Sequence, residues 1–423
     1  MNLIKPVSQQ NSKAPATSVA PTLAKRFEEP KAPADGAKAV KRGERLFSLD
    51  FLRGLDIFFL TVVGVILFAV YDNYGLNPVV YGQILHAEWV GFTLYDIIMP
   101  LFIFMCGAAL PLALPKYLEE DGSASLSYWV HVLKRVGMLW ILGMIAQGEL
   151  FSFDLHRISF FNNTLQTIAV GFLVTAVVAR IPSKKVQIAV PFVLAAGYTA
   201  FLHLCGDFTQ AGNAAVVYET KFLMLFYPHE TWHPVKQIVE LGYTWWPTVP
   251  MFGVMGLAGY FATQILLNEK WTPQKKASVQ MMTGLGLVAL GLALTTFDPC
   301  IKHIFTASFT FIAMGISFVL FSMCYTIFDI KRWRFGLGLI MLFGRRSLLA
   351  YMLAETCFGR LLDGFPNAVL PALQAKLTAP QYALLTVLVK CAALVFVLYV
   401  WDWYKRGKAA ADKAAREAAG EKK

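Results

Sequence analysis

The segment ILHAEWVGFTLYDIIMPLFIFMCGAALPL, residues 84–112, decides the fold. Its second half is a run of Ile, Met, Leu and Phe with the apolar character of a bilayer-spanning helix. Its first half places His86, Glu88 and Asp96 within about three helical turns of one another. The segment therefore predicts a membrane helix that begins with titratable side chains.

The composition of the whole chain is that of a polytopic membrane protein. Of its 423 residues, 57% are apolar and 15% are charged, whereas soluble domains are about 25% charged. Apolar runs of about 20 residues, the length that spans a bilayer, recur along the chain. They cover residues 51–71, 93–114, 136–153, 166–182, 186–204, 248–267, 279–297, 304–327, 338–358 and 384–403. We expect an all-α polytopic membrane protein with about ten transmembrane helices.

The distribution of Lys and Arg predicts the orientation in the membrane. The basic residues lie mainly in both tails and in every second connection, while the other connections hold few. The first set includes Lys134, Arg135, Lys184, Lys185, Lys270, Lys331 and Arg332, and the second includes Arg157, Lys221 and Lys302. The positive-inside rule then places both termini in the cytoplasm. It also explains the net charge of +11 without a nucleic acid partner.

This orientation divides the chain into three parts. Residues 1–45 are rich in Pro, Ala and Lys, and we expect a disordered basic cytoplasmic tail. Residues 46–404 form the membrane domain, and 405–423 form a charged cytoplasmic tail.

The first outward loop carries the candidate catalytic residues. An unperturbed histidine has a pKa near 6.5, about the value that suits proton transfer at neutral pH, so His86 is a candidate general base. Asn73, at the outer end of the first helix, offers an amide donor for a developing oxyanion. Glu88 and Trp89 flank the histidine. From spacing alone, a loop histidine beside a tryptophan is more commonly a surface residue, and that alternative stays open.

Charged residues also occur in the first helix. Asp50, Arg53 and Asp56 are spaced three apart and share one helix face. Each charge left unpaired at the centre of a membrane helix costs about 2.5–3.5 kcal/mol. A structural cluster of ion pairs is the first interpretation, and a ligand-facing role is the second. We expect no metal site, because prolines flank the HxxxH spacing of residues 229–233.

Four motifs resemble one known family. RLFSLDFLRG (45–54) and HAEWVGFTLYDIIMPLFIFMCG (86–107) resemble the transmembrane heparan-α-glucosaminide N-acetyltransferases, most closely bacterial relatives labelled N-acetylglucosamine-related transporters. HRISFFNNTLQTIA (156–169) is a weaker match, and FGRRSLLAY (343–351) has Arg346 where the family motif has asparagine. The resemblance runs from Arg45 to Trp401. Departures at Val90 and Leu101 imply a changed acceptor pocket.

The resemblance implies transfer of an acetyl group across a bacterial inner membrane. Cytosolic acetyl-CoA would donate the group to the amine of a terminal or free glucosamine-type sugar on the periplasmic side. The active-site histidine of the family falls on His86, and a preceding asparagine falls on Asn73. The expected substrate-binding residues are Glu88, Trp89, Asp96 and Arg157. Two roles stay open for Asp96, which either orients the imidazole or pairs with a buried base such as Arg157.

The phosphates of CoA require basic residues. Arg345 and Arg346 are the candidate cofactor-binding pair, since the planar guanidinium suits phosphate. Their alternative role is that of interfacial arginines whose side chains reach out of the bilayer. The expected partners are acetyl-CoA, the amino-sugar acceptor and the lipid bilayer, with a homodimer as an open alternative and no nucleic acid.

The rival function is secondary transport of N-acetylglucosamine or a related sugar. The two halves of the chain lack the paired broken helices that mark many transporters. A membrane scaffold without chemistry leaves the intramembrane charges unexplained.

Overall fold

The expectation of an all-α protein is confirmed for the part of the chain that the structure describes. The computed structural model describes residues 45–75, 77–119, 123–148, 161, 163–224, 245–354, 364, 366, 370–374 and 376–418. These residues form helices and no β-strand, and two isolated β-bridges join Val90 to Ile301 and Leu118 to Ala124. The N-terminal tail, expected to be disordered, lies outside the described residues apart from Arg45.

Eight helices of the described chain are long and apolar enough to cross a membrane. They are Phe47–Tyr74 (α2, Phe47–Phe58; π-helix Phe59–Val63; α3, Gly64–Tyr74), Leu94–Ala113 (η2, Leu94–Ile97; α5, Ile98–Ala113), α6 (Leu126–Gln147), α8 (Lys184–Cys205), Trp246–Leu266 (η6, Trp246–Thr248; α11, Val249–Leu266), α12 (Pro273–Leu294), Ala307–Ile330 (α13, Ala307–Cys324; η7, Tyr325–Ile330) and the apolar part of α18 (Ala379–Ala418). The shorter elements between them include α4 (Pro78–Ile84), α9 (Ala214–Met224) and α17 (Pro371–Gln374). The chain is therefore a multi-pass helical membrane protein.

Two of the ten expected spans take another form. The run 166–182 corresponds to α7 (Thr164–Val178), which has 15 residues. The run 338–358 is broken into α14 (Gly338–Arg345) and α15 (Ser347–Ala354), because the backbone leaves the helical conformation at Arg346 (φ −123°, ψ 29°). The long helix α18 continues to Ala418, so most of the charged segment that follows residue 404 is helical.

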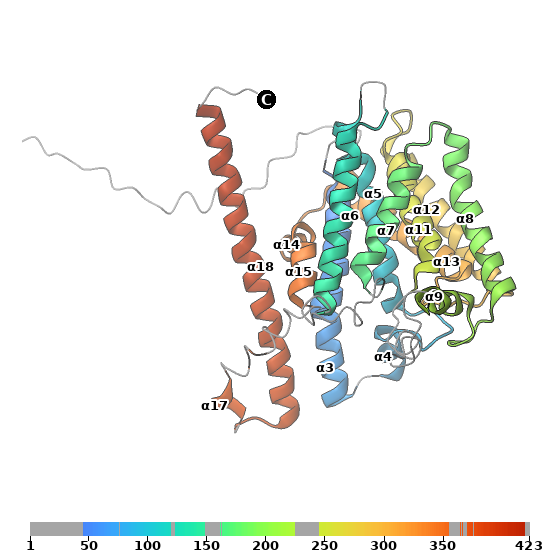
Figure 1. Cartoon of the computed structure of the whole chain (residues 1–423). Coiled ribbons are helices and arrows are strands. Elements are labelled where there is room, and N and C mark those ends of the chain that lie inside the picture. The colour runs from blue at the N-terminus through green and yellow to red at the C-terminus, as the bar shows by residue number, and fades with distance from the viewer. Residues whose placement is uncertain are drawn as a thin grey trace, which may run out of the picture. The chain divides into compact units, whose positions relative to one another are not determined.

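The centre of the bundle is formed by α5 and α11. In each of these two spans, 72% of the most apolar window is buried inside the protein, against 17% for α8 and α18. The two central helices approach closely because Gly107 has no side chain. A Cβ atom at this position would overlap the carbonyl oxygen of Gly256. The helix α18 packs beside α3, α14 and α15 (Figure 1). The apolar surfaces of α8 and α18 therefore face lipid.

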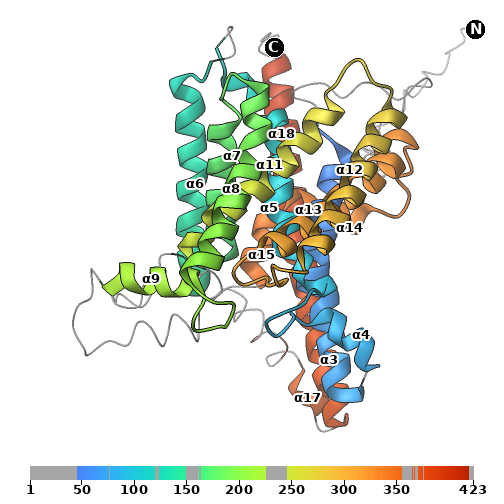
Figure 2. The ribbon, with the colours of Figure 1, turned by 90° about the vertical axis from the view of Figure 1, so that its right-hand side faces the viewer.

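The connections of the bundle gather at two ends. Figures 1 and 2 place residues 114–119, 123–125, 179–183 and 267–272 at one end, which we call the basic end. They place α4 and the end of α3 that precedes it at the other, which we call the α4 end (Figure 2). The helix α5 runs from the α4 end to the basic end, and α6 returns in the opposite direction.

Candidate functional site

The loop between α4 and η2 carries His86, and a local sequence pattern fixes its shape. Thr93 and Asp96 form a capping box at the start of η2, in which each residue binds the backbone of the other. The Thr93 hydroxyl also lies 2.6 Å from the carbonyl oxygen of Leu85. Asp96 is fully buried by this arrangement. The T-x-x-D spacing thus places a buried carboxylate at the α4 end of the span.

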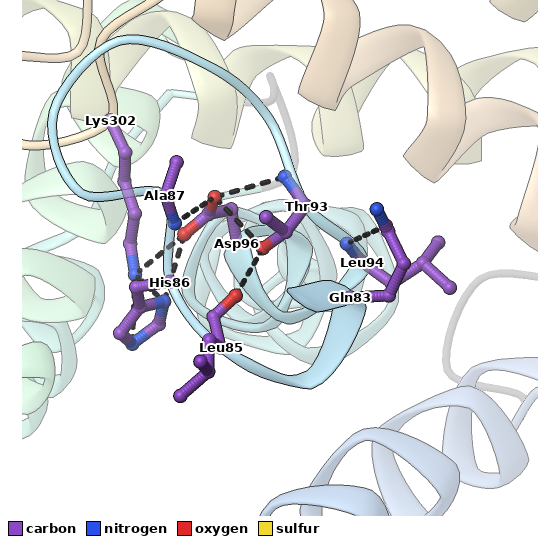
Figure 3. A network of polar contacts seen from close by, with 8 residues as sticks. All are labelled: Gln83, Leu85, His86, Ala87, Thr93, Leu94, Asp96 and Lys302. Carbon is purple, nitrogen blue, oxygen red and sulfur yellow. Dashed lines mark hydrogen bonds and ion pairs between the residues drawn. The ribbon is translucent and has the colours of Figure 1, made fainter. Parts of the chain in front are cut away.

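Asp96 binds the imidazole of His86 directly (Figure 3). Its Oδ1 lies 2.8 Å from Nδ1 of His86. Its Oδ2 accepts the backbone N–H of Ala87 at 3.3 Å and of Thr93 at 3.1 Å. Because the carboxylate only accepts, the proton of the neutral imidazole lies on Nδ1. This tautomer places the lone pair of the ring on Nε2.

Lys302 completes a three-residue group that the sequence did not predict. Its Nζ lies 2.8 Å from Nδ1 and 3.2 Å from Nε2 of His86, and 3.4 Å from Oδ1 of Asp96. Its side chain is only 6% exposed. Figure 3 shows Lys302 reaching the histidine from a different segment of the chain. The group therefore contains a base, a carboxylate that orients it, and a positive charge.

The connection between α12 and α13 positions Lys302. It is joined to the His86 loop by the bridge between Val90 and Ile301 and by a hydrogen bond of 2.8 Å from Gly91 N to Cys300 O. Phe305, whose N–H donates to the carbonyl of Lys302 at 3.0 Å, has a positive φ of 47°. Such a conformation of a bulky residue costs about 1–3 kcal/mol. The surrounding packing holds this strained turn, because Phe305 is fully buried.

Cys300 lies in the same connection but is unsuited to nucleophilic catalysis. Burial, with the nearby charges of Asp96 and Asp298, raises the pKa of its thiol to about 12. The thiolate is the nucleophilic form of cysteine, and it is scarce at neutral pH when the pKa is this high. His86 is therefore the candidate for proton transfer in this group, and Cys300 is not a candidate nucleophile.

A cavity of about 650 Å³ extends from this group through the bundle. Residues at the α4 end of its lining include His86, Tyr95 and Lys302. Residues toward the basic end include Arg53 and Arg135. The wall between them comes from α2, α5, α6, α7 and α15. One cavity thus connects the histidine with arginines deep in the bundle.

The structure points to Asn163, rather than Asn73, as an amide donor in the cavity that His86 lines. The amide nitrogen of Asn73 donates to Ala69 O at 2.8 Å, and Asn73 is not part of the cavity lining. Asn163 is buried and lines the cavity. Its Oδ1 caps α7 by accepting Leu165 N at 2.7 Å, while its Nδ2 forms no hydrogen bond with any described residue. Its amide protons are therefore available to a ligand.

The other predicted substrate-binding residues have different positions. Glu88 is exposed and is absent from the cavity lining. Trp89 lies against the α12–α13 connection, where it stacks on His303 with ring centres 5.5 Å apart. Its Nε1 donates to Phe208 O at 2.6 Å, so it anchors the His86 loop. Arg157 lies outside the described residues.

The charged triplet of the first helix is divided. Arg53 Nη1 lies 3.3 Å from Asp50 Oδ1, and Arg45 also pairs with Asp50. Asp56 is buried, and its Oδ2 makes no hydrogen bond with any described residue. Arg53 takes part in a structural ion pair and also lines the cavity. The ion pair confirms a structural role for Arg53, and its place in the cavity lining keeps the ligand-facing role as a prediction.

Arg345 and Arg346 both pair with the buried carboxylate of Asp402 on α18. Nη2 of Arg345 and Nε of Arg346 each lie 3.0 Å from one of its oxygens. Arg406 approaches it at 3.2 Å. Neither Arg345 nor Arg346 lines the cavity. The pair joins the break between α14 and α15 to α18, a structural role that the sequence did not indicate.

Residues 45–241 match the family model of a domain of unknown function, DUF5009. The match covers a little less than half of the chain and includes His86, Asp96 and Asn163, whereas Lys302 lies beyond it. The family description names no activity. No curated protein matches the sequence.

Proposed function

We propose that the protein is an inner-membrane acetyltransferase that moves the acetyl group of acetyl-CoA to the amine of a glucosamine-type sugar. One observation carries the proposal. The His86–Asp96–Lys302 group lies at one end of a cavity that also reaches Arg53 and Arg135. A base at one end and cations at the other match the needs of an acyl donor with a long arm and phosphate groups. The resemblance of residues 45–54 and 86–107 supports the same assignment.

The chemistry begins at Nε2 of His86. The amine of the acceptor attacks the thioester carbon, a C–N bond forms, and Nε2 accepts the proton that the amine loses. Asp96 holds the ring in the required tautomer and stabilises the imidazolium. The negative charge on the former carbonyl oxygen is stabilised by Lys302 and by the amide of Asn163. When the intermediate collapses, the C–S bond breaks and the CoA sulfur takes the proton from His86.

The same residues also fit a two-step route through an acetyl-imidazole. In that route CoA is released before the acceptor binds. Release of one equivalent of CoA per protein without acceptor would identify it. Direct transfer requires the acceptor before any CoA appears.

The decisive experiment separates transfer from transport. The protein is reconstituted in liposomes, and N-acetylation of glucosamine is measured with acetyl-CoA supplied on one side. Uptake of N-acetylglucosamine is measured in parallel without acetyl-CoA. Acetyl-CoA-dependent product supports the proposal, whereas uptake without product establishes the transporter alternative.

A matched pair of histidine variants makes the experiment specific. His86→Ala should abolish transfer, since loss of a general base lowers the rate by about 10²–10⁴-fold. His131 is an exposed histidine on α6 that stacks on Tyr117 near the basic end. His131→Ala should retain activity. Full activity of a folded His86→Ala protein would refute the proposal.

A further inference from the structure

The basic end of the cavity contains a cation that pairs with no carboxylate of the described residues. Arg135, on α6, lies with its Nη2 3.1 Å from Sγ of Cys106. Its guanidinium carbon lies 4.6 Å from the ring centre of Phe172. Among the described residues it has no carboxylate within ion-pair distance. These contacts fix the direction of the guanidinium but leave its charge unneutralised.

Arg53 adds to the positive charge at this end. It shares the single carboxylate of Asp50 with Arg45, and it lines the same cavity as Arg135. Among the described residues, Asp50 is thus the one carboxylate paired with Arg53, the exposed Arg45 competes for it, and none pairs with Arg135. Cations inside membrane helices are costly, and where they occur they face a cavity or a ligand. The observed excess of positive charge calls for an anion.

The distance along α5 indicates what kind of anion fits. Cys106 marks the level of Arg135, and Asp96 marks the level of His86. The ten residues between them correspond to about 15 Å along the helix axis. A pantetheine arm has the length of about five extended residues, or about 17 Å. An acyl donor of this kind can reach from the arginines to the imidazole.

We propose that Arg53 and Arg135 bind the phosphate groups of the acyl donor at the basic end of the cavity. This inference rests on the proposed function and assigns its anion-binding subsite. The arm of the donor runs along α5 between Cys106 and Asp96, with the thioester beside His86. Guanidiniums suit this task because their fixed forks hold phosphate oxygens in bidentate geometry.

The position of Arg345 and Arg346 is consistent with this assignment. Both guanidiniums pair with Asp402, as Arg53 pairs with Asp50, but neither residue lines the cavity. The phosphate-binding role that sequence suggested for them is better filled by Arg53 and Arg135. Arg406, the most exposed partner of Asp402, provides a matched arginine outside the cavity.

The test measures ligand binding without turnover. CoA and pantetheine, which lacks the nucleotide and its phosphates, are titrated into the full-length protein in lipid nanodiscs by calorimetry. Arg135→Gln and Arg53→Gln should each weaken CoA binding by about 10–100-fold and leave pantetheine binding unchanged. The wild-type affinity for CoA should fall as salt rises. Arg406→Gln should bind CoA as the wild type does.

The controls separate this inference from the proposed function. Arg135→Lys keeps the charge and removes the fork, so it should lose less affinity than Arg135→Gln, and thermal unfolding verifies that each variant is folded. Equal losses for CoA and pantetheine, or none for either, would overturn the subsite. Absence of CoA binding by the wild type would overturn it as well. Arginine-dependent CoA binding without N-acetylation would leave the subsite standing and refute the acetyltransferase.

Discussion

Replacing Asp96 by asparagine reverses the tautomer of His86 with almost no change of shape. In the wild type, Oδ2 of Asp96 accepts the backbone N–H groups of Ala87 and Thr93, and Oδ1 accepts from Nδ1 of His86. An asparagine has a single oxygen, and the two backbone donors require it at the Oδ2 position. Its NH₂ group then points at Nδ1, which must accept. The imidazole proton moves to Nε2, where the lone pair is needed.

The size of the expected effect follows from this loss of the base. General-base catalysis contributes about 10²–10⁴-fold, which corresponds to about 2.7–5.4 kcal/mol of transition-state stabilisation. Asp96→Asn should therefore lower kcat/KM for N-acetylation to the level of His86→Ala. Because the two residues act as one unit, the double variant should be no slower than either single variant.

Steady-state transfer with acetyl-CoA and glucosamine measures this effect, and thermal unfolding checks that the variant is folded. Asp72→Asn is the matched control, since Asp72 is an exposed residue on α3. An Asp96→Asn protein that is folded and retains activity within about threefold of the wild type would refute the base assignment. A double variant much slower than each single variant would show that the two residues act separately.

Three further substitutions test two other residues of the proposed site and one buried carboxyl group outside it. Lys302→Gln removes the positive charge beside the imidazole and should lower kcat by about 10²–10³-fold, and an unchanged kcat in a folded variant would exclude it from catalysis. Asn163→Ser keeps a residue type that caps α7 and removes the side-chain amide. It should therefore lower kcat more than Asn73→Ala does. A larger loss of kcat in Asn73→Ala would contradict the assignment to Asn163. Glu219 on α9 is buried, and its burial raises the pKa to about 8, although the N–H of Trp246 opposes this. Its folded carboxyl keeps a proton that the unfolded chain releases, so stability should fall between about pH 4.5 and 8, and Glu219→Gln should raise the unfolding temperature at pH 9 but not at pH 4. Equal shifts at both pH values would refute the raised pKa.

The sequence predicted most of the helices because a bilayer imposes a length on each span. About 20 apolar residues are needed to cross it, and eight helices of the described chain meet this condition. The break at Arg346 was not predictable in this way. Mean hydropathy over 338–358 is insensitive to a single residue that leaves the helix, and the ion pair that Arg346 forms at the break involves Asp402, which is distant in the sequence.

The sequence placed part of the site for a different physical reason. His86 and Asp96 are ten residues apart and are joined by one capping loop, so their proximity is a local property. Lys302 reaches the same imidazole from 216 residues away in the sequence. Its position depends on the bridge to Val90 and on the strained turn at Phe305. A single sequence contains no local signal for a contact of this kind.

Arg135 shows that the distribution of Lys and Arg predicts the orientation of the helices in the membrane but not the position of a ligand site. In the sequence it counts among the basic residues that predict the orientation of the chain, as any lysine of those connections does. In the structure it lies nine residues inside α6, beside Cys106 and Phe172, and faces a cavity. A charge at this depth gains nothing from the water at the basic end and loses its hydration. Arginines therefore occur both in the exposed connections that predict the orientation and at the proposed binding site. Only the burial and the partners of each guanidinium distinguish these two kinds of arginine.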